Sequence, residues 1–388
     1  MSHVVSIQRM DNLPVLQTGG NAGSGGIRNP IVVVALIPGS ALTVGQTGPT
    51  VRINGGVNNS QTMLVEGMDA SNSLGQGASQ QNQVPTDAVE EFAIQTSNFA
   101  AEYGTAGGAM INMVTKSGTN VYHGSGYDYV VNEALNAYQP YLGTRNKIRQ
   151  QDFGWTIGGP VIIPKLYNGK NKTFFFYSME KFKQTNVVVS NSTVPTSAYR
   201  TGDFSRLISA ENRLLSTAAG AATDALGRTI PSGTIFDPNT TAVAAANGRS
   251  YRDPFPGNAI PVSRFDPIAV KVLALVPLPQ GPNFQRGLAT NNYTGTFDSS
   301  RSTRIPSVKV DQNVGSKGRL SFYFQYTQTT TPRTAAGADP LPDTITAGVL
   351  AMADGYTSRL NYDYNLSPRM LLHVGVGYQS VDQGVPSV

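Results

Sequence analysis

From about residue 121 onward, apolar and polar side chains alternate with a period of two in seven stretches of the chain. In one stretch, Val308 and Val310 share one face while Lys309 lies on the opposite face. Such alternation predicts β-strands, and in six of the seven an apolar face lies opposite small or polar residues. The predicted strands cover 121–131, 153–163, 173–183, 307–311, 320–327, 360–365 and 370–379.

The connections between these strands alternate between short and long. Tight turns at 164–172, 315–318 and 365–369 are separated by long stretches at 184–303 and 328–355. A soluble β-sandwich also alternates its side chains but gives no reason for alternating loop lengths. Outer-membrane barrels have short periplasmic turns and longer extracellular loops, so the pattern favours a barrel wall.

The loop pattern also predicts orientation. With periplasmic tight turns, the first strand runs outward and 184–303 becomes a long extracellular insert. Apolar faces should then point to lipid. On the first strand we expect Tyr127 and Tyr129 on that face, with Gly126 and Asp128 on the other.

Residues 1–120 have a different pattern, rich in Gly, Asn and Gln, with separate apolar stretches. This predicts a compact α+β unit that enters from the periplasmic side, where a barrel plug belongs. The predicted fold is therefore mainly β: an α+β plug domain at 1–120, followed at 121–388 by an incomplete antiparallel transmembrane β-barrel.

Composition agrees with this class of fold. Of 388 residues, 14% are charged, well below the about 25% of soluble domains, and 41 are Gly. The longest apolar run, 31–37, is too short for a membrane helix and predicts a buried strand or a short core helix. There is no Cys, which excludes disulfides and thiolate sites. The net charge of +5 contains no block of five like charges, so nucleic acid is not an expected partner.

Residues for catalysis or metal binding are not brought together by the sequence. His3, His123 and His373 lack metal-ligand spacing, and no nucleophile elbow or P-loop motif occurs. Glu90 and Glu91 are adjacent, so on a strand they face opposite ways. We therefore expect no enzyme, no cofactor and no metal site.

Three regions resemble TonB-dependent outer-membrane receptors of the Oar-like subgroup. They are VRINGGVNNSQTMLVEGMDA at 51–70, the stretch 85–120 with the following HGSGYDY, and insert motifs such as VPTSAYRTGDFSRL at 194–207. The resemblance covers roughly 30–388. It implies a set of structural plug-motif residues, namely Asn54, Gly55, Glu66, Gly67, Asp69, Glu102, Tyr103, Gly104, Gly107, Gly108, Lys116, Ser117 and Gly118.

The resemblance implies a receptor in the outer membrane of a Gram-negative bacterium that takes up a scarce nutrient. Its implied partners are outer-membrane lipid and the inner-membrane TonB energy-coupling complex. We expect an N-terminally truncated plug without a TonB box and an inactive fragment of a longer receptor. The alternatives are a surface adhesion protein anchored by its barrel and a soluble β-rich protein. Glu66, Asp69, Glu102 and Lys116 are either plug residues that pair with the wall or ordinary solvated charges.

Overall fold

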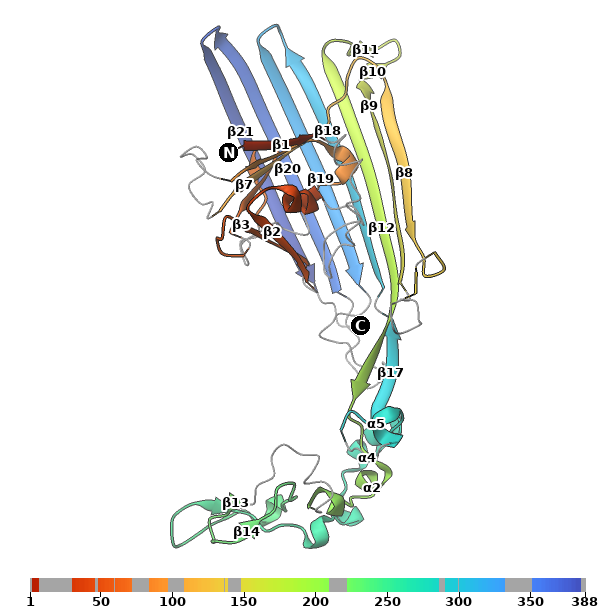
Figure 1. Cartoon of the computed structure of the whole chain (residues 1–388), viewed down its shortest axis with the longest axis vertical. Coiled ribbons are helices and arrows are strands. Elements are labelled where there is room, and N and C mark those ends of the chain that lie inside the picture. The colour runs from red at the N-terminus through yellow and green to blue at the C-terminus, as the bar shows by residue number, and fades with distance from the viewer. Residues whose placement is uncertain are drawn as a thin grey trace. The chain divides into compact units, whose positions relative to one another are not determined.

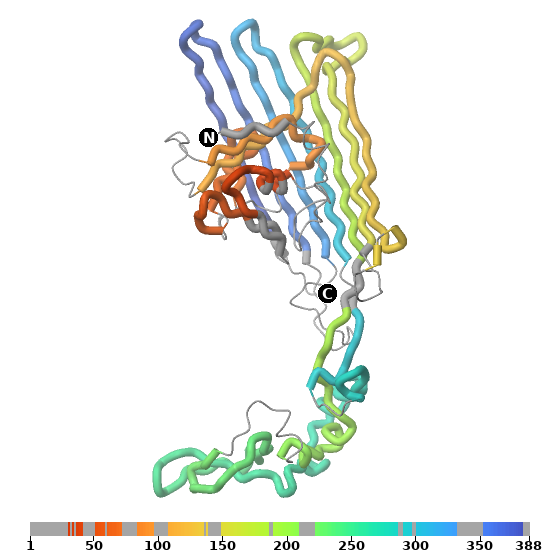
Figure 2. Tube along the Cα trace, in the orientation of Figure 1, coloured from red at the N-terminus to blue at the C-terminus, as the bar shows by residue number. Residues whose placement is uncertain are grey.

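The computed structural model divides the chain into two compact units. Unit 1 comprises Met1–Val187, Asp298–Thr334 and Val349–Val388, and unit 2 comprises Val188–Phe297 and Ala335–Gly348. Figures 1 and 2 trace the chain through both. The structure describes residues 2–6, 30–45, 48–58, 60–71, 84–96, 108–135, 137–138, 148–208, 222–285, 290–298, 300–331 and 351–384.

Unit 1 contains a long antiparallel sheet, called the wall below, whose strands follow one another in sequence order (Figure 1). Each of the seven predicted strands is present, and the prediction of a mainly β fold with an antiparallel wall is confirmed. A further strand, β17 (Tyr293–Asp298), pairs with β12. The wall strands are β8 (His123–Val131), β9 (Ile148–Pro160), β12 (Thr173–Ser192), β18 (Arg301–Val314), β19 (Gly318–Thr331), β20 (Ala351–Ser367) and β21 (Met370–Gly384).

The two faces of the wall differ in polarity. On β18 the odd-numbered residues from Arg301 to Asp311 are buried, whereas Val308 and Val310 lie on the other, outer face. Large apolar side chains stay exposed on that outer face in a continuous band, which suits contact with lipid hydrocarbon. The band includes Phe153, Trp155, Ile157, Phe322, Phe324, Leu360, Leu372, Val374 and Val376.

Strand β8 is an exception, and our prediction for its faces was wrong. Tyr127 is registered with Gly154 and Tyr129 with Asp152, so both tyrosines lie on the inner face. The Tyr127 hydroxyl donates a 2.9 Å hydrogen bond to the buried Glu180 carboxylate. A tyrosine hydroxyl that faces hydrocarbon has no hydrogen-bond partner, whereas on the inner face it can donate to a buried carboxylate. This hydrogen bond favours the inner face more strongly than the aromatic rings favour the outer one.

A second sheet of unit 1 lies against the inner face of the wall. Its strand order is β1-β6-β7-β4-β5, with β4 and β7 parallel and the other pairs antiparallel. This sheet, a separate antiparallel hairpin of two strands and two 3-10 helices together form what we call the plug. The apolar run near 31–37 forms a short 3-10 helix rather than a strand. The plug elements are β1 (Ser2–Ser6), η1 (Pro30–Leu36), β2 (Ser40–Gly45), β3 (Gly48–Ile53), β4 (Thr62–Val65), β5 (Met68–Asp69), η3 (Thr86–Ala88), β6 (Val89–Gln95) and β7 (Met110–Thr115).

The plug and the wall share one apolar core. Plug side chains such as Val34, Phe92 and Ile111 are fully buried, and the same cluster includes Phe176 of β12 and Tyr323 of β19. The plug therefore completes its core against the wall, because its small sheet leaves an apolar face that needs a cover.

Unit 2 is built from short elements. Among the described residues, no helix is both long enough and apolar enough to cross a membrane. Apart from β17, the elements within this unit are α2 (Ser197–Arg200), η5 (Ser205–Ile208), β13 (Ala222–Thr223), β14 (Thr229–Ile230), η6 (Pro238–Thr240), β15 (Ala242–Val243), β16 (Ser250–Tyr251), η7 (Pro256–Asn258), η8 (Val262–Arg264), α4 (Pro267–Leu275) and α5 (Pro282–Gln285).

Candidate functional site

Two tight turns of the plug require left-handed backbone. Asn54 and Gly55 have φ of 51° and 73°, and Glu66 and Gly67 have φ of 53° and 76°. Asn-Gly is a favoured pair for such turns, whereas a left-handed Glu is uncommon and strained. Because Glu66 and Gly67 join β4 directly to β5, they form the tip of a hairpin, called the plug hairpin below. The unusual conformation of Glu66 must be held by its side-chain contacts.

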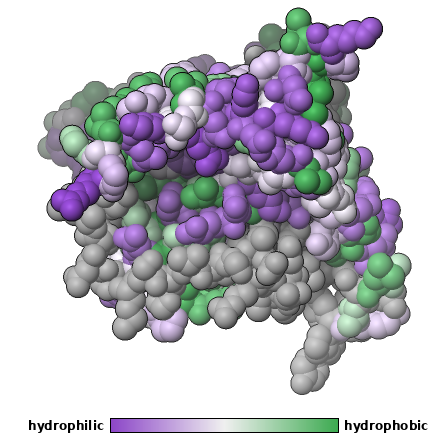
Figure 3. Space-filling view, turned by 90° about the horizontal axis from the view of Figure 1, so that it is seen from above, coloured by the Kyte–Doolittle hydropathy of each residue, from purple (hydrophilic) through white to green (hydrophobic). Residues whose placement is uncertain are grey.

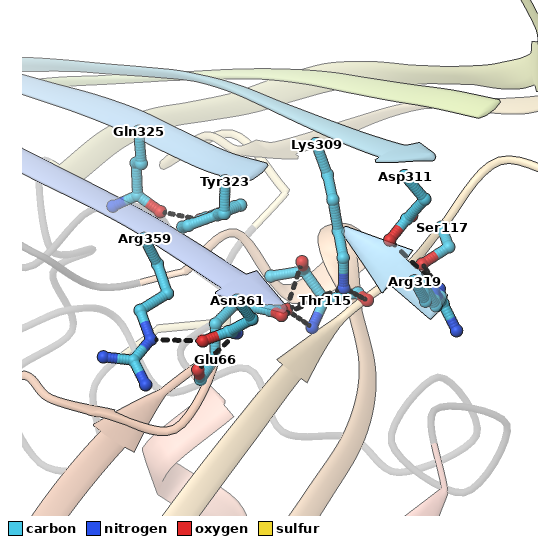
Figure 4. A network of polar contacts seen from close by, with 10 residues as sticks. All are labelled: Glu66, Thr115, Ser117, Lys309, Asp311, Arg319, Tyr323, Gln325, Arg359 and Asn361. Atoms are coloured by element: carbon cyan, nitrogen blue, oxygen red, sulfur yellow. Dashed lines mark hydrogen bonds and ion pairs between the residues drawn. The ribbon is translucent and has the colours of Figure 1, made fainter. Parts of the chain in front are cut away.

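The Glu66 carboxylate ties plug and wall together (Figure 4). Its Oε1 accepts 2.6 Å hydrogen bonds from the backbone N–H and the hydroxyl of Thr115, the last residue of β7. Lys309 Nζ, from wall strand β18, lies 3.0 Å from both carboxylate oxygens and 3.0 Å from the Thr115 carbonyl oxygen. Only 5% of the Lys309 side chain and 7% of the Glu66 side chain are exposed.

A second wall strand holds the same turn. The Asn361 amide of β20 donates to the Glu66 carbonyl oxygen at 3.3 Å, and Arg359 Nε donates to Asn361 Oδ1 at 2.7 Å. Figure 4 shows these side chains directed toward the plug hairpin. The hairpin tip is therefore fastened to both β18 and β20.

The energetics of this fastening depend on burial. Removing two charges from water costs free energy, which only close contact and additional hydrogen bonds offset. Removing one partner of a buried pair typically costs about 3–5 kcal/mol, because the other charge stays buried without a counterion. Nearby, Arg319 and Asp311 also form a 3.0 Å pair, but the Arg319 side chain is 51% exposed. The Asp311 side chain is only 2% exposed, but solvent reaches and screens the Arg319 end, so we expect Glu66–Lys309, buried on both sides, to be the stronger link.

The remaining plug-motif residues have local roles. The Asn54 amide donates to the Thr96 carbonyl oxygen at 2.9 Å, and Asp69 accepts from the Ser71 N–H at 2.8 Å. The Lys116 N–H donates to the Ala88 carbonyl oxygen at 2.8 Å.

Ser117, Gly108 and Gly118 lie where chain segments meet. The Ser117 hydroxyl is 3.5 Å from Arg319 of the wall. At Gly118 a Cβ would lie 2.2 Å from the Phe175 carbonyl oxygen, so only glycine fits there, and at Gly108 it would meet the Ser60 hydroxyl at 3.2 Å. Glu102, Tyr103, Gly104 and Gly107 lie outside the described residues.

Comparison with known proteins identifies the wall. Residues 114–387 match the family model of the outer membrane beta barrel domain. The chain belongs to this family. It is 30% identical over 132 residues to the TonB-dependent transporter Oar of Myxococcus xanthus, covering 30% of this chain and 12% of that protein.

The fold of the chain resembles that of a solved outer-membrane receptor. The ferric enterobactin receptor PfeA in complex with BCV-L6 superposes with a TM-score of 0.51 at 11% identity, covering 98% of this chain and 41% of that one. A double mutant of the receptor from Pseudomonas aeruginosa gives a TM-score of 0.48 at 12% identity, covering 98% and 40%. The chain thus spans less than half of each of these proteins. Its relatives are transporters and receptors, and the predicted resemblance and Gram-negative outer-membrane location are confirmed.

The sequence predicts only the plug side of this link between plug and wall. Glu66 was among the predicted motif residues, but Lys309, Thr115 and Asn361 were not. Lys309 could have been predicted to face inward, because it is a cation on the polar face of an alternating strand. Nothing in the sequence distinguishes Thr115 or Asn361 from other polar residues.

Unit 2 holds a separate pocket of about 480 Å³ between two short hairpins. Arg228 contacts two of the lining residues: it pairs with Asp224 at 2.6 Å, and its guanidinium lies 5.6 Å from the centre of the Tyr251 ring. It also pairs with Asp253 at 2.6 Å. The hydrogen bonds that Arg228 donates to the carboxylates of Asp253 and Asp224 raise its pKa, so the guanidinium stays charged. The lining residues are Thr223, Asp224, Ala225, Phe236, Thr241, Arg249, Ser250, Tyr251 and Arg252.

Clustered metal ligands are absent from the part of the chain that the structure describes, where no group of three or more His, Cys, Asp or Glu could hold an ion.

Proposed function

We propose that this chain supplies the plug and part of the wall of a TonB-dependent transporter that takes up a nutrient across the outer membrane. The name of the Oar relative and the receptor fold support this assignment. In the proposed mechanism the inner-membrane TonB complex pulls on a segment ahead of the plug. In the proposed division, the plug occupies 1–120, the wall occupies 121–388, and 184–303 is an extracellular insert.

The observation that carries this proposal is the nature of the plug–wall contact. Besides the apolar contacts to Phe176 and Tyr323, a buried ion pair, Glu66–Lys309, joins the plug to the wall, and the inner face of the wall carries many hydroxyl and amide groups. Such groups exchange protein hydrogen bonds for water at little net cost. A plug held in this way stays closed at rest and can still be moved by an applied force. The polar lining includes Thr303, Ser307, Gln325, Thr327, Thr329 and Thr357.

We further propose that the wall works only as part of a closed barrel. Among the described residues, β8 and β21 each pair with one neighbour, so each leaves one edge of backbone N–H and C=O groups. In hydrocarbon such edges cannot be satisfied. Transport therefore requires further strands beside these edges, and residues 1–388 expressed alone should aggregate rather than insert.

A reversible lock between plug and wall tests the transport proposal. A Cβ added to Gly377 would lie 2.8 Å from Met68 Cγ of the plug hairpin, close enough for a disulfide between Met68→Cys and Gly377→Cys. The chain has no other cysteine to interfere. In the full receptor that contains this chain, the oxidised lock should abolish TonB-dependent uptake, and reduction should restore it.

The single variants Met68→Cys and Gly377→Cys are the matched controls and should transport in both redox states. Undiminished uptake through the oxidised lock would refute a moving plug. Retained surface binding in cells without TonB, with no uptake in any state, would instead favour the adhesion protein.

A further inference from the structure

The tight turns of the wall carry basic side chains without acidic ones, and the nearest acidic residues on the adjoining strands, Asp311 and Asp363, contact Arg319 and His373. The connections 160–172, 313–319 and 365–371 contain no Asp or Glu. Arg319 turns inward to Asp311, and the other basic residues are exposed to solvent. We call these exposed residues the basic rim: Lys165, Lys170, Lys172, Lys317 and Arg369.

The opposite end of the wall is mixed in charge. There Asp128, Glu133 and Asp354 occur among basic residues such as Lys181 and Lys183. Figure 3 looks onto the tight-turn end, where hydrophilic residues stand along the edge with hydrophobic residues between them. The uniform positive charge is thus a property of one end only.

The first connection adds apolar side chains to the rim. Strands β10 (Ile162–Ile163) and β11 (Tyr167–Asn168) form a small hairpin whose turn is closed by a 3.0 Å hydrogen bond from the Leu166 N–H to the Ile163 carbonyl oxygen. Leu166 at its tip is 81% exposed, and Ile163 is 47% exposed. Apolar side chains beside lysines are poorly suited to plain water but match the boundary between headgroups and acyl chains.

Asparagine contacts hold the rim in place. Asn120 and Asn171 bond to each other twice, through the Asn171 N–H at 2.7 Å and the Asn120 amide at 2.6 Å. The Asn313 amide donates to the Asn171 carbonyl oxygen at 3.1 Å, and its N–H donates to the Lys172 carbonyl oxygen at 2.7 Å. The turns after β9 and β18 are therefore joined through their backbone, which keeps the residues that carry the lysines close together.

The rim directly continues the lipid-facing band. Outer-face Ile157 on β9 is followed within a few residues by the β10–β11 hairpin. Between them the Tyr122 ring covers Gly159, where an added Cβ would lie 2.3 Å from Tyr122 Cδ1, and it lies 6.4 Å from the Phe175 ring. Aromatic rings mark the membrane–water interface. Basic side chains just beyond them stand at headgroup depth.

We propose that the basic rim binds the headgroups of anionic phospholipids in the periplasmic leaflet of the outer membrane. Ammonium and guanidinium groups donate charge-assisted hydrogen bonds to phosphate oxygens, while the hairpin's apolar side chains enter the acyl boundary. The position of the rim at the end of the lipid-facing band favours lipid over a periplasmic protein or cell-wall polymer. The leaflet follows from the proposed orientation, but the preference for anionic lipid does not depend on transport.

The test places a reporter on the rim. Ser316 is exposed in the turn between β18 and β19, and a fluorophore on Ser316→Cys reports which lipids lie there. The full receptor is reconstituted in vesicles containing phosphatidylglycerol or phosphatidylcholine with a quencher on the headgroup. We expect phosphatidylglycerol to quench more strongly, and high salt to remove the difference.

Charge variants locate the effect. Replacing Lys165, Lys170 and Lys172 by Gln should lower the relative affinity for phosphatidylglycerol by about tenfold to a hundredfold, since each basic group near an anionic surface contributes to binding. The triple replacement by Arg should retain the preference. Lys181→Gln with Lys183→Gln, midway along β12 and away from the tight turns, should leave it unchanged.

Three outcomes would overturn the proposal. They are equal quenching by both lipids in the native receptor, a preference that survives the triple Gln variant, and an equal loss in the Lys181 and Lys183 variant. Displacement of the quenching lipid by soluble peptidoglycan fragments, but not by added phosphatidylglycerol, would instead assign the rim to the cell wall. Uptake measured on the same variants separates this proposal from the transport proposal.

Discussion

Replacing Lys309 by Met is the sharpest perturbation of the plug–wall link. Methionine keeps the apolar stem of lysine but leaves the Glu66 carboxylate, 7% exposed, without its counterion. Glu66 retains two hydrogen bonds from Thr115, so we expect the lower end of the range for a broken buried pair, about 3 kcal/mol. That free energy corresponds to a bit over a hundredfold more frequent opening of the plug hairpin from the wall.

Hydrogen exchange at Thr115 measures this opening directly, because its N–H donates to the Glu66 carboxylate. In the full receptor, Lys309→Met should speed exchange there by roughly a hundredfold. The double variant Glu66→Gln with Lys309→Met should recover most of the protection, since no buried charge remains and the amide can still accept from Thr115. Arg149→Met, which breaks the more exposed pair with Glu133, is the control and should change exchange by less than about fivefold.

Unchanged exchange in Lys309→Met would refute the reasoning that this pair holds the plug. So would a double variant whose loss equals the sum of the two single losses, because contacting partners should not behave additively.

Three further predictions follow from the same structure. In the full receptor, Val374→Arg on the outer face should destabilise by roughly 2–4 kcal/mol near the bilayer midplane, whereas His373→Arg, which points inward, should be tolerated. Chemical unfolding in lipid measures both variants, and the reverse order of stability would contradict the face assignment. Protease added to intact cells should cut within 222–285 of the insert and spare the tight turns after β18 and β20, and the opposite pattern would reverse the orientation. Gly118→Ala should destabilise more than Gly55→Ala. The alanine Cβ at position 118 would lie 2.2 Å from a backbone oxygen, whereas an alanine at position 55 would meet no atom and be strained only by its φ of 73°. Equal midpoints in thermal unfolding would argue against the close approach at Gly118.

Local features of the chain were enough to predict the wall. The period of two around Val308 and Val310 fixes both the strand and its two faces, because successive side chains of a strand point to opposite sides. The strands themselves are longer than predicted: β18 runs from Arg301 to Val314, where the sequence pattern is apparent only at 307–311. Backbone pairing with neighbours extends a strand past the point where its own side chains identify it.

Contacts between distant residues decided the rest. Tyr127 turns inward because Glu180, 53 residues away, is buried beside it, and an amphipathic tyrosine suits either face until that partner is known. Glu66 and Lys309 are 243 residues apart, and neither residue alone indicates a buried pair. The alternation of side chains, the tight turns and the proposed plug-plus-wall division can all be derived from local stretches of the chain. Which charges meet cannot, because burial and pairing depend on the packed molecule and not on any one segment.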